Sequence, residues 1–308
     1  MRTYVIRRRG GGLFSIITSV LANLSVAESK GLEPYVDLES LPTPYQENMP
    51  VNGTRNVWEY YFAPVSRVSR AEALLHSRAE SAEGFPKGFS DSLYQNEIYW
   101  KMWEKYCHLS QPSRQYVQSE MVRLNPNSDT LGVHFRGQEQ RTASRHPLPP
   151  TLRQMADAVS HLLEFGGFEK ILLVTEGQQY VDYFLRRFPG RVDVTSTFRL
   201  RYKNSYRLKK PPRSQHFYRL GLESLSDAFL LSSCGGLIGC NSNLTDGAAF
   251  LGRSRHSVSL VVNNGFNTAH PIFKKFKWYL HAGLPHSWGG FDNWKEATDV
   301  RVGRELIH

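Results

Sequence analysis

The sequence predicts an α/β protein built from two domains, each with a parallel β-sheet. The chain opens with a strand–helix–strand unit over residues 3–38, and strands and helices alternate again after residue 125. The strand predicted at 170–176 contains a continuous apolar run after Lys170, which is typical of a parallel strand buried on both faces. The length of 308 residues is sufficient for two domains of ordinary size.

The first domain is predicted to cover residues 1–126. Its opening strand is followed by a loop of three glycines, Gly10, Gly11 and Gly12. A helix from Leu13 to Lys30 comes next, because its apolar residues recur every three or four positions. The glycine loop would let the backbone approach a ligand closely. It lacks the last glycine of a dinucleotide-binding loop, and an ordinary packing turn explains it equally well.

The second domain is predicted to cover residues 127–270, where strands and helices alternate. The strands are expected at 131–135, 170–176, 192–194, 236–239 and 258–262, and the helices at 152–165, 179–188, 222–231 and 246–251. Thr151 is expected to cap the first of these helices. Residues 271–308 form a tail rich in Trp, Tyr and His, for which packing back on the first domain is one option.

The composition favours an anionic partner. The formal net charge is +10, so nucleic acid, a phospholipid surface or a phosphorylated small molecule would each suit the charge. The basic clusters are short and come with no recognisable nucleic-acid-binding motif, so a nucleic-acid partner is not expected. Contact with an anionic membrane surface stays compatible with the charge.

The sequence shows no candidate membrane span, because no apolar run reaches the ~18 residues that a span needs. Residues 7–27 superficially resemble a signal peptide, but a strand precedes them and polar residues interrupt their apolar part. Cys107, Cys234 and Cys240 lack the dense spacing of a disulfide framework, and the last two are expected to be buried. We therefore expect a cytoplasmic protein that is soluble or peripherally attached to a membrane.

Polar side chains gather where three strands of the second domain end. They are His134, Arg136 and Glu139 at the end of the first strand and just beyond it, Thr175 and Glu176 at the end of the second, and Asn241, Ser242 and Asn243 after the fourth. Because the carboxyl ends of parallel strands meet at one edge of a sheet, we expect these side chains to converge. The last group also begins a helix, whose N–H groups and dipole favour an anion.

Arg136 opposite that helix start would form a clamp for a diphosphate, since its guanidinium stays charged and donates several hydrogen bonds at once. The alternative is that residues 241–243 only cap a helix and that the strand at 131–135 ends in a solvated turn. No Asp-x-Asp pair follows a strand and the histidines lack metal-ligand spacing, so no metal is expected. The clamp, rather than a metal ion, would neutralise the charge of the diphosphate.

These segments resemble a known family. His134-Phe135-Arg136 followed by Glu139 is similar to the His-x-Arg-Arg-x-Asp motif of the α-1,6-fucosyltransferases, nodulation fucosyltransferases and protein O-fucosyltransferases. Further matches follow in the family's order, at His146-Pro147, at the strand ending in Thr175-Glu176, at the helix that contains Asp227, and at residues 237–244. The resemblance covers residues 130–252 most firmly, and the glycine loop also suits it.

The resemblance implies a GT-B fold, in which two Rossmann-like domains face each other across a cleft and the C-terminal one holds the nucleotide sugar. It implies GDP-fucose as donor, inversion at the anomeric carbon, no metal, and a glycan or other hydroxyl acceptor. Arg136 would bind the β-phosphate and stabilise the departing GDP, and His134 would shape the same pocket. Asp227 would hydrogen-bond the nucleoside, while Ser242 and Asn243 would bind phosphate.

Two departures from the family pattern affect the catalytic prediction. The second arginine of the motif is replaced by Gly137, and residues 140–145 contain no acid where the core α-1,6 enzymes carry one. Glu139 is then the best candidate for general base, since a hydroxyl nucleophile needs a proton acceptor. Asp37, Glu59 or the GDP itself are equally plausible as the group that accepts the proton.

Two other functions fit the same residues. One is a glycosyltransferase of the same fold that uses a different GDP- or UDP-sugar. The other is a basic module that binds nucleotide sugar or glycan and has lost catalysis.

Overall fold

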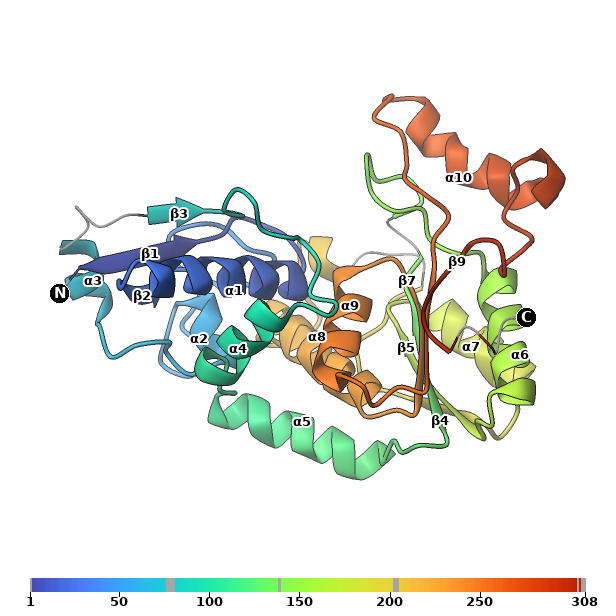
Figure 1. Ribbon diagram of the computed structural model, residues 1–308, viewed down its shortest axis with the longest axis horizontal. Helices are drawn as coiled ribbons and strands as arrows, with labels where there is room; N and C mark the ends of the chain where they lie inside the picture. The colour runs from blue at the N-terminus through green and yellow to red at the C-terminus, as the bar shows by residue number, and fades with distance from the viewer. Residues whose placement is uncertain (1, 76–80, 138–139, 202–204, 304, 306–308) are drawn as a thin grey trace. The chain divides into compact units, whose positions relative to one another are not determined.

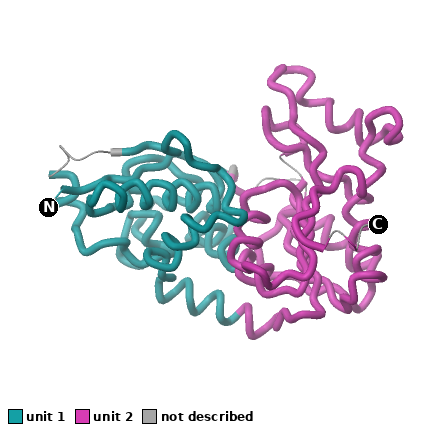
Figure 2. The backbone as a smooth tube through the Cα atoms, viewed as in Figure 1, with its two compact units in different colours: residues 1–119, 209–226 teal, residues 120–208, 227–308 magenta. Residues whose placement is uncertain are grey.

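The computed structural model describes residues 2–75, 81–137, 140–201, 205–303 and 305. The chain divides into two compact units (Figures 1 and 2). The first contains residues 1–119 and 209–226, and the second contains residues 120–208 and 227–308. The helices α5 (Gln111–Leu124) and α8 (His216–Ser232) each begin in the first unit and end in the second.

The first unit is an α/β layer around a small parallel sheet. Its elements are β1 (Thr3–Arg7), α1 (Leu13–Ser29), β2 (Glu33–Val36), α2 (Val57–Tyr61), α3 (Arg70–Leu75), β3 (Ser81–Glu83) and α4 (Glu97–Tyr106). The strand order is β2-β1-β3, and β1 pairs in parallel with both neighbours. The predicted strand–helix–strand opening is therefore confirmed.

The second unit contains a six-stranded sheet. Its elements are β4 (Thr130–Phe135), α6 (Leu152–Phe165), β5 (Lys170–Thr175), α7 (Gln178–Arg187), β6 (Val192–Val194), η1 (Ser205–Arg207), β7 (Gly236–Cys240), α9 (Asn243–Gly252), β8 (Val258–Val262), α10 (Phe273–Gly283), η2 (His286–Trp288) and β9 (Thr298–Val302). The sheet order is β6-β5-β4-β7-β8-β9. The first five strands are parallel and β9 is antiparallel to β8.

The order of the five parallel strands is the Rossmann order 3-2-1-4-5, counted from β4. Helices α6 and α7 cover one face of this sheet, and α8 and α9 cover the other (Figure 1). Because successive side chains of a strand point to opposite faces, Leu131, Val133 and Phe135 enter the core with α6 and α7. His134 points to the opposite face, toward α9. The predicted α/β fold with parallel sheets is confirmed.

Most predicted elements of the second unit agree with the structure within a few residues. The Thr151 hydroxyl accepts a hydrogen bond from the Gln154 N–H, and the Gln154 side chain accepts one from the Thr151 N–H, which confirms the helix cap. Cys234 and Cys240 are buried, as expected. In the tail, β9 joins the sheet and Trp294 joins its core, so residues 271–308 belong to the second unit.

Within the described ranges, no helix is both long and apolar enough to cross a bilayer.

Candidate functional site

The candidate site lies at the carboxyl edge of the second unit's sheet. Strand β4 is paired on one side with β5 and on the other with β7, so the ends of all three strands are neighbours. Phe135 lies beside Thr175 in the register, and His134 lies beside Gly239. The strand order reverses at β4 and β7, and sheets of this kind bind ligands at such a switch point.

His134 is held at this edge by α9. Its Nδ1 lies 2.8 Å from Thr245 Oγ1 and 3.3 Å from Ser242 Oγ. The Thr245 hydroxyl donates its single proton to the Cys240 carbonyl, 2.8 Å away. We therefore assign the proton of the imidazole to Nδ1, which donates to Thr245 and leaves Nε2 as a hydrogen-bond acceptor.

The imidazole of His134 is neutral. Only 4% of the residue is exposed. Burial, assisted by the positive charge of Arg136, lowers the pKa of His134 to about 3.

Arg136 follows directly after β4 and reaches the tip of β5. Its Nε lies 3.3 Å from Glu176 Oε2, and the side chains of the two residues are 34% and 25% exposed. Gly137 occupies the position of the motif's second arginine. A Cβ there would lie 3.1 Å from Tyr180 Oη, so Tyr180 fills the space beside the backbone where the family pattern has a larger residue.

Asp227 is buried on α8 and is linked to the tip of β5. Its two carboxylate oxygens accept from the Thr197 hydroxyl at 2.9 and 3.0 Å. The guanidinium of Arg199 donates to the carbonyl oxygens of Thr197 and Thr175, at 2.9 and 3.1 Å. The third Arg199 nitrogen donates to the Thr195 hydroxyl at 3.0 Å, so this loop is fixed against the sheet edge.

The segment Asn241–Asn243 forms the start of α9, as predicted. Ser242 is the N-cap, and its hydroxyl accepts from the Thr245 N–H at 3.3 Å. Asn241 is half-buried and Asn243 is exposed. The N–H groups of Asn243 and Leu244 are the first two of the helix and have no acceptor within it, which suits an anion.

The glycine loop belongs to the first unit, where it joins β1 to α1. Gly10 and Gly11 have φ angles of +60° and +85°, a region that favours glycine. The Gly10 N–H donates to the Pro42 carbonyl at 3.0 Å, and Gly12 is the N-cap of α1. The conformation therefore requires glycine at two positions of the loop.

The candidate general bases differ in their surroundings. Glu139 lies outside the described residues. Asp37 is fully buried and is paired with Arg7 at 3.0 Å. Although burial opposes it, hydrogen bonds from Ser40 and Arg7 lower the pKa of Asp37, so this carboxylate is a poor proton acceptor. Glu59 accepts from the Thr54 hydroxyl at 2.8 Å and from the Asn56 amide at 3.0 Å.

Sequence reasoning missed two residues that organise the site, Thr245 and Arg199. Thr245 lies three residues after Ser242. The backbone N–H at this position usually donates a hydrogen bond to the side chain of the N-cap residue, and this spacing could have pointed to Thr245. Arg199 begins the run of basic residues that ends at Arg213. Nothing in the sequence distinguishes Arg199 from the other lysines and arginines of that run.

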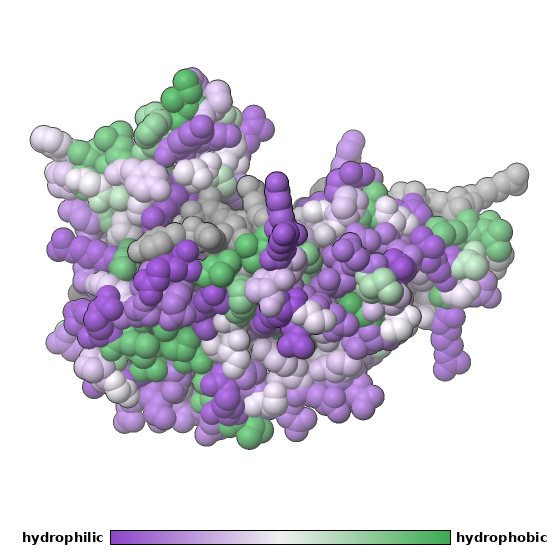
Figure 3. Space-filling model, turned by 180° about the vertical axis from the view of Figure 1, so that it is seen from behind, coloured by the Kyte–Doolittle hydropathy of each residue, from purple (hydrophilic) through white to green (hydrophobic). Residues whose placement is uncertain are grey.

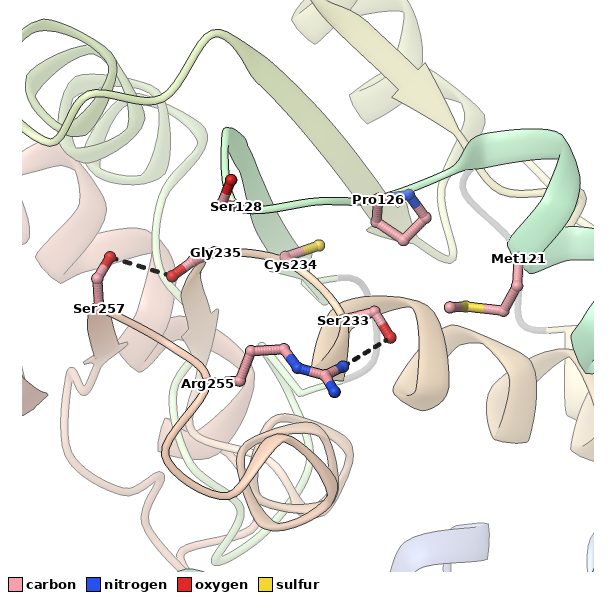
Figure 4. A pocket seen from close by; sticks show the side chains of 8 residues that line it. All are labelled: Met121, Pro126, Ser128, Ser233, Cys234, Gly235, Arg255 and Ser257. Carbon is pink, nitrogen blue, oxygen red and sulfur yellow. Dashed lines mark hydrogen bonds between the residues drawn. The ribbon is translucent and has the colours of Figure 1, made fainter.

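A hollow of about 500 Å³ lies at the opposite edge of the sheet (Figure 4). Ser128, Gly235 and Ser257 line it just before β4, β7 and β8 begin. Its one basic residue, Arg255, donates to the Ser233 hydroxyl at 3.3 Å. This hollow is therefore separate from the strand ends that carry His134 and Arg136.

Across the described parts of the chain, no three His, Cys, Asp or Glu side chains cluster as metal ligands do.

No protein-family model and no curated protein matches this sequence. Solved structures with a similar fold include three of the nodulation fucosyltransferase NodZ. The α-1,6-fucosyltransferase NodZ co-crystallised with GDP is 15% identical, with a TM-score of 0.57, over 86% of this chain and 96% of that one. NodZ from Bradyrhizobium is 16% identical, with a TM-score of 0.58, over 86% and 96% of the two chains. NodZ soaked with GDP-fucose is 17% identical, with a TM-score of 0.56, over 85% of this chain and 95% of that one.

The chain shares their fold. The likeness spans nearly the whole of each NodZ chain, so it includes both α/β units. The GT-B architecture expected from the sequence motifs is confirmed by it.

We expect the neutral His134 to make the protein less stable in acid. Below the unfolded-state value of 6.5, the unfolded chain binds a proton that the folded chain excludes until about pH 3. The free energy of unfolding should therefore fall by up to about 1.4 kcal/mol per pH unit over this window. Urea denaturation at pH 7 and pH 5 would measure the effect, which His134→Gln should reduce. The exposed His108→Gln serves as control, and equal pH dependence of wild type and His134→Gln would contradict the assignment.

Proposed function

We propose that the protein is a fucosyltransferase that transfers fucose from GDP-fucose to a hydroxyl of a glycan or glycoconjugate. The observation that carries this proposal is that Arg136 directly follows β4 at the switch point of the sheet, and that the neighbouring strand β7 leads into the start of α9. An always-charged guanidinium and two helix N–H groups form a binding surface for a diphosphate. The shared fold with NodZ, which has been crystallised with GDP, supports the nucleotide.

In this proposal Arg136 binds the β-phosphate and stabilises the charge that develops on departing GDP. Its ion pair with Glu176 is partly exposed, and such pairs contribute about 0–1 kcal/mol. Charge-assisted hydrogen bonds to phosphate are stronger, at about 1.5–3 kcal/mol each. Exchange of the carboxylate for a phosphate is therefore favourable. Glu176 then holds the arginine in place before the donor arrives.

The remaining donor contacts come from the same edge. Ser242, with Asn241 and Asn243, would bind phosphate oxygens at the start of α9. Asp227, through its carboxylate, would accept a hydrogen bond from the nucleoside. His134 would offer Nε2 as an acceptor in the same pocket.

Thr175 supports this surface through its carbonyl, which anchors Arg199. The glycine loop of the first unit, Gly10 to Gly12, would let the backbone approach a ligand closely, and the positive φ angles of Gly10 and Gly11 favour glycine there.

The chemical step is proposed to be a single displacement with inversion and without a metal. The acceptor oxygen attacks the anomeric carbon from the face opposite GDP, and the bond to the phosphate oxygen breaks. GDP leaves with that electron pair, and the hydroxyl proton passes to the general base. Glu139 is the proposed base, since Asp37 is enclosed by Arg7 and Ser40.

Arg136→Ala should raise the dissociation constant for GDP by about tenfold to a hundredfold, because it removes charge-assisted hydrogen bonds. Titration calorimetry would measure this. In the wild type, GDP and GDP-fucose should raise the melting temperature while UDP-sugars should not. Arg153→Ala, 81% exposed on α6, is the matched control. Stabilisation by UDP-sugars alone would show that the donor is different, and GDP-fucose binding without turnover on any acceptor would indicate a binding module.

Glu139→Gln should lower the rate of fucose transfer by about a hundredfold or more, because the acceptor hydroxyl loses its proton acceptor. The affinity for GDP-fucose should stay the same, which distinguishes a base from a donor ligand. Release of GDP in the presence of acceptor measures the rate. Glu164→Gln, an exposed carboxylate on α6, is the control. Unchanged turnover in Glu139→Gln would move the role to Glu59 or to the GDP itself.

Removal of divalent metals should leave transfer unchanged within about twofold, since Arg136 and the start of α9 supply the positive charge that a bridging cation would otherwise provide. The measurement is GDP release after exhaustive treatment with EDTA, compared with the same sample given excess magnesium or manganese. Loss of activity that either ion restores would contradict metal independence.

A further inference from the structure

Helix α10 and its flanks carry a concentrated set of exposed apolar side chains. Of the 14 large hydrophobic residues found exposed in the described chain, seven lie between Phe266 and Trp288. On α10 and just before it they are Ile272, Phe273, Phe276, Tyr279 and Leu280, which are 45–65% exposed. We call these five residues the α10 face. Phe273, Phe276 and Leu280 are three, four and seven residues apart, so they lie on one side of the helix.

The α10 face is not needed to hold the helix on the protein. A different side of α10 performs that task, through the buried Trp278, which packs with Leu148 and Phe291. The indole N–H of Trp278 donates to the Pro149 carbonyl at 2.8 Å, and the Arg141 guanidinium lies 4.1 Å from the ring centroid. The helix therefore has one apolar side for attachment and a second that faces solvent.

Basic residues accompany the α10 face. Lys274, Lys275 and Lys277 alternate with its aromatic residues along the helix. No Asp or Glu occurs anywhere from residue 261 to residue 291. Hydrophobic and hydrophilic side chains are interleaved on the lobe that carries α10 (Figure 3). The surface is thus both apolar and positively charged, with no nearby carboxylate in the sequence to offset it.

We propose that the α10 face docks the protein on an anionic phospholipid bilayer. Aromatic and aliphatic side chains of a helix that lies in the membrane interface enter the acyl boundary, while flanking lysines reach the lipid phosphates. Each lysine near an anionic surface strengthens binding about fivefold. A second copy of the chain is a poorer occupant, because a symmetric contact would bring the two sets of lysines together. This inference is independent of the proposed function.

The test is cosedimentation of the full chain with vesicles. Wild-type protein should bind vesicles of equal phosphatidylglycerol and phosphatidylcholine, and should bind pure phosphatidylcholine at least tenfold more weakly. Phe276→Ser with Leu280→Ser should weaken binding to the anionic vesicles by about tenfold or more. Lys274→Gln with Lys275→Gln should weaken it similarly and reduce its salt dependence.

Matched controls separate docking from general effects. Phe165→Ser removes an aromatic side chain that is 58% exposed on α6, and Lys209→Gln with Lys210→Gln removes two exposed charges elsewhere. Both variants should bind the vesicles like wild type. The proposal would be overturned if the control variants lost as much vesicle binding as the α10 variants, or if the wild type did not bind the vesicles at low salt. So would dimers in solution that the Phe276→Ser, Leu280→Ser variant dissociates.

A fluorescent label gives a second measurement that does not depend on loss of binding. The three native cysteines are buried, so a cysteine introduced as Phe276→Cys can be labelled with an environment-sensitive dye. Its emission should shift to shorter wavelength when anionic vesicles are added, and the same dye at Phe165→Cys should not respond. A response at both positions, or at neither, would contradict insertion of the α10 face.

Discussion

The pairing of β4 with both β5 and β7 is the constraint on which the candidate site depends. This one strand carries His134 and is followed directly by Arg136, and the segments after its two neighbours supply Glu176 and the start of α9. The strand can lie in the middle only because its side chains satisfy two different environments. Leu131, Val133 and Phe135 pack under α6 and α7, whereas His134 must find hydrogen bonds on the buried side that faces α9.

The imidazole satisfies that requirement in a way that affects the chemistry. Buried polar groups are costly unless they are hydrogen-bonded, and the bond from Nδ1 to Thr245 meets this condition. Gly239 makes the contact possible, since a Cβ at that position would lie 2.6 Å from Thr245 Oγ1. A neutral histidine then stands beside a charged arginine without electrostatic repulsion. The positive charge at this edge therefore comes from Arg136 and from the start of α9, and both can bind an anion.

The loop after Arg136 connects the candidate site to the α10 lobe. Arg141 lies between the Tyr180 hydroxyl and the Trp278 ring, and Asn267 donates to the Arg141 carbonyl at 3.3 Å. The same segment of chain therefore leads from the proposed phosphate ligand to the helix that we propose docks on lipid.

The sequence by itself determined the five parallel strands of the second unit, most of its helices and the residues at the ends of those strands. Hydrophobic periodicity is a property of neighbours along the chain, so strands such as 170–175 and helices such as 152–165 are visible without a structure. The short elements β3 and α3, the helix α10 and the edge strand β9 were not predicted, because short or mixed segments carry little periodic signal. Only the tertiary structure decided that Thr245 holds His134 and that Arg199 ties Asp227 to β5. Apart from the local contact between Arg199 and Thr197, these contacts join residues 24 to 111 positions apart. They arise from the packing of whole elements rather than from any local pattern.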